Sequence, residues 1–115
     1  MAEKPSLELD PEDRKLVVLA RSTRARTQAP VGASVRDRDG RTYAAADVAL
    51  PSLQIGALDL AVAMAVSSGA TGLEAAALVV DGTVPDLGAV RDLAGEGVAV
   101  LVADPRGTVT EVLRT

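Results

Sequence analysis

The chain has 115 residues, a length that fits one domain, and a net charge of -4 at neutral pH. Hydrophobic residues make up 48% of it and charged residues 24%, which is typical of a folded, soluble protein and unlike a disordered one. The sequence contains no cysteine and no histidine, which excludes disulfides and any zinc site built from thiolates or imidazoles.

The N-terminal residues 1–9 are polar and acidic, unlike a secretory signal with a basic start and an apolar stretch. The longest apolar stretch, residues 53–66, is interrupted by Gln54 and Asp59 and is shorter than the ~20 residues of a membrane span. We therefore expect no membrane association and a cytoplasmic location.

The first helix is predicted from its capping residues. Asp10 is a good N-cap, Pro11 suits the first helical position, and Glu12 and Asp13 place negative charge on the first turn. The helix should end before Pro30.

A hairpin should follow the first helix. We expect strands at residues 31–35 and 41–48, joined by a turn at residues 37–40 in which Gly40 takes a positive φ. Gly32 lies inside the first strand, where a glycine marks either a bulge or a close approach of another backbone.

A second helix is predicted over residues 52–68, capped by Ser52 and ended by Gly69. It is apolar nearly all round, whereas a surface helix shows a polar face. We therefore expect it to be covered on two sides, by the sheet and by a second copy of the chain.

The remaining elements alternate between apolar strands and a short helix. Strand, helix and strand in that order predict a parallel pair in a mixed sheet. The predicted elements are a strand at 73–80, a helix at 87–94 capped by Asp86, a strand at 98–103, a turn at 104–107 and an edge strand at 108–113.

Several short motifs in this order resemble those of the short bacterial cytidine deaminases. They are PVGA at residues 30–33 with DGR at 39–41, AVSSG at 65–69, GAVR at 88–91 and ADPRG at 103–107. The resemblance implies an α/β fold in which a mixed five-stranded sheet carries helices on both faces. It also implies a tail at residues 1–9 and a single cytidine-deaminase-like domain at 10–115.

In that family a zinc ion activates water and a glutamate transfers protons, so the resemblance also indicates where these groups would lie. The zinc-ligand positions fall on Gly56, Leu87 and Val90, and the proton-transfer position falls on Leu58. None of these side chains binds zinc or transfers a proton. We therefore expect neither metal nor another cofactor.

The substrate-binding positions are changed as well. The family's pyrimidine-flanking phenylalanine corresponds to Ala29, and its ribose-binding residues correspond to Asp47 and Ala49. Together with the four catalytic positions, these residues would form a remnant pocket that is filled by apolar side chains.

The sequence thus predicts a catalytically inactive protein with a structural, scaffolding or regulatory role, acting as a homo-oligomer, either dimer or tetramer, or through another protein. A sensor that binds a nucleoside or nucleotide in the remnant pocket is the first alternative.

RNA binding through the Arg21–Arg41 region is the second alternative. It requires the end of the first helix and the tip of the hairpin to lie close together. The net negative charge and the single aromatic residue, Tyr43, argue against nucleic acid.

Overall fold

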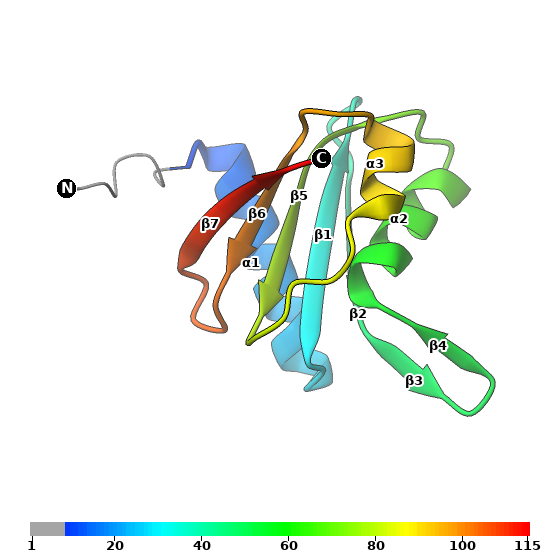
Figure 1. The fold of residues 1–115 in the computed structure, drawn as a ribbon, viewed down its shortest axis with the longest axis vertical. Helices are drawn as coiled ribbons and strands as arrows, with labels where there is room; N and C mark the ends of the chain where they lie inside the picture. The colour runs from blue at the N-terminus through cyan, green and yellow to red at the C-terminus, as the bar shows by residue number, and fades with distance from the viewer. Residues whose placement is uncertain (1–8) are drawn as a thin grey trace.

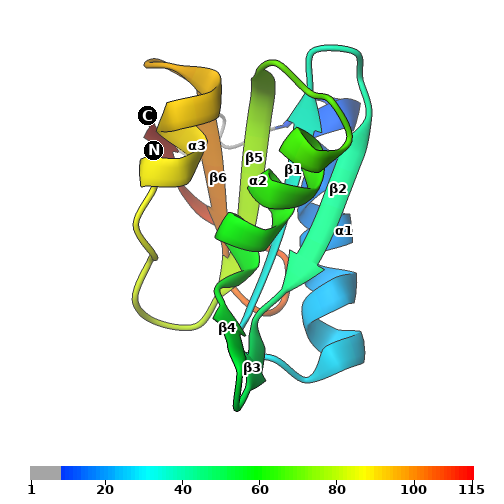
Figure 2. The same cartoon turned by 90° about the vertical axis from the view of Figure 1, so that its right-hand side faces the viewer.

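The computed structural model describes residues 9–115, so the predicted tail lies outside the described residues except for Leu9. A five-stranded sheet carries one helix on one face and two helices on the other, and a separate two-stranded hairpin projects from one end (Figures 1 and 2). The predicted α/β architecture is therefore confirmed. The elements are α1 (Pro11–Thr27), β1 (Val31–Asp37), β2 (Thr42–Ala46), β3 (Val48–Leu50), β4 (Leu53–Ile55), α2 (Ala57–Ser67), β5 (Leu73–Val80), α3 (Gly88–Ala94), β6 (Ala99–Ala103) and β7 (Val109–Arg114).

The strands of the main sheet are ordered β2-β1-β5-β6-β7. The β5–β6 pair is parallel, as predicted from the intervening helix, and the other pairs are antiparallel. The last strand, β7, lies at one edge, also as predicted. Among residues 9–115, no helix has the length and apolar character needed to cross a membrane.

Two apolar cores lie on the two faces of the sheet. On β5, Ala76 and Leu78 face the core beneath α2 and α3, whereas Ala75, Ala77 and Val79 face the core beneath α1. Successive side chains of a strand point to opposite faces, so a continuous apolar run is the expected pattern for a strand buried on both.

Helix α1 begins and ends where its sequence predicts. The Asp10 carboxylate accepts a hydrogen bond of 2.8 Å from the Asp13 amide, which satisfies one of the free N–H groups of the first turn. Gln28 ends the helix in the left-handed conformation (φ 56°), two residues before Pro30.

Glycine 32 lets the backbone of α1 lie directly on β1. A Cβ atom at this position would overlap the carbonyl oxygen of Ala20 and would lie 2.7 Å from the Cβ of Arg24. The close approach predicted for this glycine is confirmed, while the irregularity in β1 lies further on, between Arg36 and Asp37.

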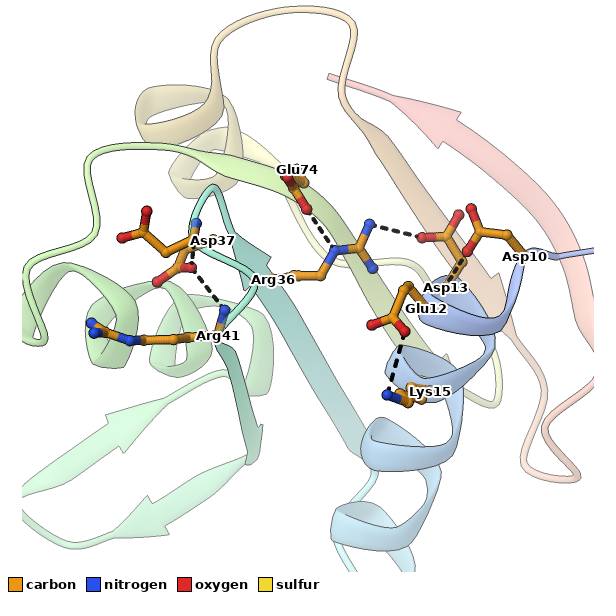
Figure 3. Close-up of polar contacts among 9 residues, drawn as sticks. Asp10, Glu12, Asp13, Lys15, Arg36, Asp37, Arg41 and Glu74 are labelled. Carbon is orange, nitrogen blue, oxygen red and sulfur yellow. Dashed lines mark hydrogen bonds and ion pairs between the residues drawn. The ribbon is translucent and has the colours of Figure 1, made fainter.

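Two polar side chains of β1 extend this contact along the helix. The buried Ser34 hydroxyl donates a hydrogen bond of 2.7 Å to the Leu16 carbonyl oxygen. Arg36 forms ion pairs with Asp13 of α1 (Nη2–Oδ1 3.1 Å) and Glu74 of β5 (Nε–Oε1 2.8 Å), as Figure 3 shows. Burial acts to lower the pKa of Arg36, but its bonds to Glu74 and Asp13 outweigh burial and raise that pKa.

The tip of the β1–β2 hairpin is organised by the buried Asp37 carboxylate. It accepts hydrogen bonds from the amides of Asp39 (2.9 Å) and Arg41 (3.0 Å) and from the Tyr43 hydroxyl (2.8 Å). Burial acts to raise the pKa of Asp37, but these hydrogen bonds outweigh it and leave that pKa below its ordinary value. The hydrogen bond to Asp37 in turn raises the pKa of the Tyr43 hydroxyl above its ordinary value.

The predicted start of the second helix is wrong. Residues 48–55 form the β3–β4 hairpin, in which Pro51 and Ser52 make the two-residue turn and Leu50 pairs with Leu53. Helix α2 begins only at Ala57, so Ser52 does not cap it. Proline and serine are common turn residues, and here they form the hairpin turn although the apolar pattern that follows them predicts a helix.

The last third of the chain follows the prediction closely. Helix α3 begins at Gly88, one residue later than predicted, and its N-cap is Leu87 rather than Asp86. The Asp86 Oδ1 still accepts a hydrogen bond of 3.0 Å from the Gly88 amide, and Gly95 closes the helix as predicted. The 104–107 turn is held by Asp104, whose Oδ1 accepts from the amides of Arg106 (2.9 Å) and Thr108 (3.0 Å).

We expect Gly32→Ala to lower the free energy of unfolding by about 2 kcal/mol or more, since overpacking of a tight contact costs roughly 1–3 kcal/mol. Gly88→Ala is the matched control, because its added Cβ would lie at an ordinary 3.5 Å from the Asp86 carboxylate. Denaturant unfolding of both variants measures the difference. Equal stability of the two would show that α1 moves off the sheet without cost.

Candidate functional site

Three of the four positions assigned to zinc and proton transfer meet in one apolar core. Leu58 lies in the first turn of α2 and is 2% exposed, and Val90 lies in α3 and is fully buried. Leu87, at the start of α3, is partly buried and packs against the same cluster. All three positions therefore belong to one apolar cluster.

The residues present do not fit a zinc ion. Zinc sites are built from thiolate, imidazole and carboxylate groups, whereas these positions carry aliphatic side chains and, at Gly56, no side chain. Within residues 9–115 there is also no group of three or more Asp or Glu residues placed to hold a metal ion.

Asp47, the position corresponding to a ribose ligand, binds the start of α2 instead. Its Oδ1 accepts a hydrogen bond of 2.8 Å from the Ala57 amide, the first N–H of the helix. Gly56 occupies the N-cap position and offers no side chain of its own. The cap thus comes from a residue ten positions upstream, across the whole β3–β4 hairpin.

The sequence analysis missed this role because capping is sought in the residue next to the helix. The available signal was Gly56, which has no side chain to cap the helix, following a single carboxylate, Asp47, and the turn-forming residues Pro51 and Ser52. Only the hairpin places the two together.

The other two substrate positions lie outside the buried cluster. Ala29 lies in the α1–β1 connection, where its amide donates to the Arg24 carbonyl oxygen at 3.2 Å. Ala49 is exposed in β3, opposite Gln54. Three cavities in the described structure, of about 390, 680 and 410 Å³, are lined by none of the seven positions.

The structure does not form the single basic patch that the RNA-binding alternative requires in the Arg21–Arg41 region. The C-terminal end of α1 leads into the first residue of β1, whereas the hairpin tip follows its last residue (Figure 1). A strand of seven residues separates the two by roughly 20 Å. Two of the arginines are also engaged within the fold: Arg24 donates to the Pro30 carbonyl oxygen, and Arg36 is held by Asp13 and Glu74.

We expect Asp47→Ala to lower the free energy of unfolding by about 1 kcal/mol, the usual cost of losing an N-cap acceptor. Asp47→Asn keeps an acceptor oxygen and should lose less. Ser52→Ala is the control, because Ser52 lies in the hairpin turn and should leave stability unchanged. Denaturant unfolding measures all three, and a loss in Ser52→Ala as large as in Asp47→Ala would contradict the assignment of the cap.

Comparisons with known proteins agree with the fold. Residues 9–107 match a family model described as cytidine deaminase-like. The crystal structure of a cytidine deaminase from Burkholderia pseudomallei superposes with a TM-score of 0.68 at 22% identity, covering 88% of this chain and 89% of that one. The structure of a cytidine deaminase from Mycobacterium leprae gives 0.67 at 21% identity, covering 91% and 94%. A search of curated proteins gave no match.

The structural matches share about a fifth of their residues with this chain and so establish the fold, while the family model spans most of the sequence. The chain belongs to the cytidine-deaminase-like family.

Proposed function

We propose that this protein is a catalytically inactive member of its family that acts by assembling with further copies of itself, in a structural, scaffolding or regulatory role. The observation that carries the proposal is the chemistry at Gly56, Leu58, Leu87 and Val90. The family's reaction needs a metal-activated water and a proton-transfer group, and no side chain at these positions supplies either.

The packing of these positions supports the same proposal. Leu58 and Val90 are buried among other apolar residues of the core beneath α2 and α3. A polar ligand brought into this place would lose its hydration without gaining hydrogen bonds from these side chains. Binding of a nucleoside there would require the core to open, which is why we favour assembly over a nucleoside sensor.

The outer side of α2 supports assembly. Ala57, Leu58 and Ala61 cover the sheet, whereas Met64 (36% exposed) and Val66 (52% exposed) lie on the two flanks of the helix that the sheet leaves open. The helix carries almost no charge, since Asp59 is its only ionisable residue. Exposed apolar side chains on a helix with so little charge are typical of a protein interface.

Two further features extend this apolar surface. Met64, Leu60 and Tyr43 line a shallow cavity of about 410 Å³ beside α2. The β3–β4 hairpin, which projects beyond the sheet, exposes Leu50 and Leu53 at 56% and 53%. We call α2 residues 60–66 with this hairpin the α2 surface. A second copy of the chain would bury these side chains and satisfy the helix on its open side.

Inactivity is tested on the purified full-length chain. We expect elemental analysis to find zinc far below one ion per chain, and cytidine turnover to equal that of a buffer blank. Stoichiometric zinc, or turnover above the blank, would contradict the proposal.

Assembly is tested by light scattering after size exclusion at micromolar concentration. We expect a mass of two or four times 11.7 kDa. Val66→Arg should shift the mass toward the monomer, because a charge would be buried without a partner. Val18→Arg is the matched control, since Val18 is 54% exposed on the opposite helix, α1, and the change there should leave the mass unaltered. A monomer mass for the unmodified chain would contradict the proposal.

A further inference from the structure

A polar cavity lies on the face of the sheet that α1 covers, between α1 and the β6–β7 turn. A cavity of about 390 Å³ is bordered there by three arginines: Arg14 and Arg21 on α1, and Arg106 in the turn. Thr108 adds a hydroxyl group, and the apolar part of the wall includes Leu9 and Val18. Its volume lies within the ordinary range for small-molecule sites.

The charged side chains that line this cavity are all positive. No carboxylate side chain lines it, and within residues 9–115 none of its three arginines forms an ion pair. The chain as a whole is acidic, with 16 Asp and Glu against 12 Lys and Arg. Three guanidinium groups around one cavity repel one another, and an anion between them would relieve that repulsion.

The arginines are placed by the fold. Arg14 and Arg21 are seven residues apart on α1 and therefore share one face of the helix. The Arg21 side chain lies along the turn at Gly107, where an added Cβ would approach its Cδ to 3.1 Å and its Nη1 to 3.9 Å. Gly107 has a φ of +89°, a conformation that favours glycine, and its lack of a side chain leaves room for Arg21.

A second, mostly apolar cavity of about 680 Å³ lies on the other flank of α1, toward β2. It shares Leu9, Arg14 and Val18 with the first cavity, and Pro11, Lys15, Leu19 and Thr42 complete its wall. Val18, between the two cavities, is 54% exposed. A ligand with a charged group in the first cavity would therefore place an apolar body on Leu9 and Val18.

We propose that the arginine-lined cavity, with Leu9 and Val18 in its wall, binds a small organic phosphate monoester. Arginine matches phosphate through two parallel hydrogen bonds, and a phosphate dianion balances more of the three positive charges than a single carboxylate does. The apolar body of the ester covers the side chains that α1 leaves exposed. The site uses none of the residues that carry the proposed function and lies across the sheet from the α2 surface.

Isothermal titration of the full-length chain with three probes tests the proposal. Phenyl phosphate carries both the charge and the apolar body, inorganic phosphate only the charge, and benzyl alcohol only the apolar body. We expect phenyl phosphate to bind at least about tenfold more tightly than either of the others, and to weaken as salt is added. Absence of phenyl phosphate binding, or equal binding of inorganic phosphate, would overturn the proposal.

Substitutions of the arginines test whether the ligand binds in this cavity. We expect Arg21→Gln and Arg106→Gln each to weaken phenyl phosphate binding about tenfold or more, as loss of a charge-assisted hydrogen bond does. Arg21→Lys keeps the charge but loses the paired geometry, so it should fall in between. Arg26→Gln, an exposed arginine of α1 outside the cavity, is the control and should bind like the unmodified chain. Equal weakening by Arg26→Gln, or none by Arg21→Gln and Arg106→Gln with unchanged melting, would overturn the proposal.

Discussion

The contact between α1 and β1 is the constraint on which the rest of the fold depends. Three alternate residues of β1 face the helix, and each meets it differently: Gly32 by direct backbone contact, Ser34 by a hydrogen bond to a helix carbonyl, and Arg36 by an ion pair. The helix partners, Ala20, Leu16 and Asp13, run backwards along α1, so helix and strand are antiparallel and the contact is continuous. A large side chain on this face of β1 would lift the helix from the sheet.

Small side chains also determine the packing on the other face of the sheet. The core beneath α2 and α3 contains no phenylalanine or tryptophan and is built from alanine, valine and leucine. Small side chains let both layers of helices lie close to the sheet, and close packing leaves little room for a polar site between them. The polar groups of the cavity beside α1 lie at the surface instead, where Arg14, Arg21 and Arg106 border it.

Most of the fold could be predicted from the sequence because its signals are local. Asp10 and Pro11 mark the start of α1, the Asp37–Gly40 turn marks the hairpin, and the apolar run of β5 marks a central strand. The start of α2 could not be predicted, because the β3–β4 hairpin brings its cap, Asp47, to Ala57. The apolar pattern from residue 52 onward predicts a helix there, and only the fold shows the hairpin. Whether the arginines form one patch also depends on the fold, because β1 separates the end of α1 from the hairpin tip.

The burial of Leu58 and Val90 also determines how difficult it would be to build a metal centre into this scaffold. A Leu58→Glu change alone would put a carboxylate into a dry core with no partner, and a Val90→Cys change alone would supply one ligand where a stable site needs several. Each step is thus costly until all are present. Zinc ligands introduced one at a time would therefore meet this packed core at every step, so the core opposes any gradual route to a metal site.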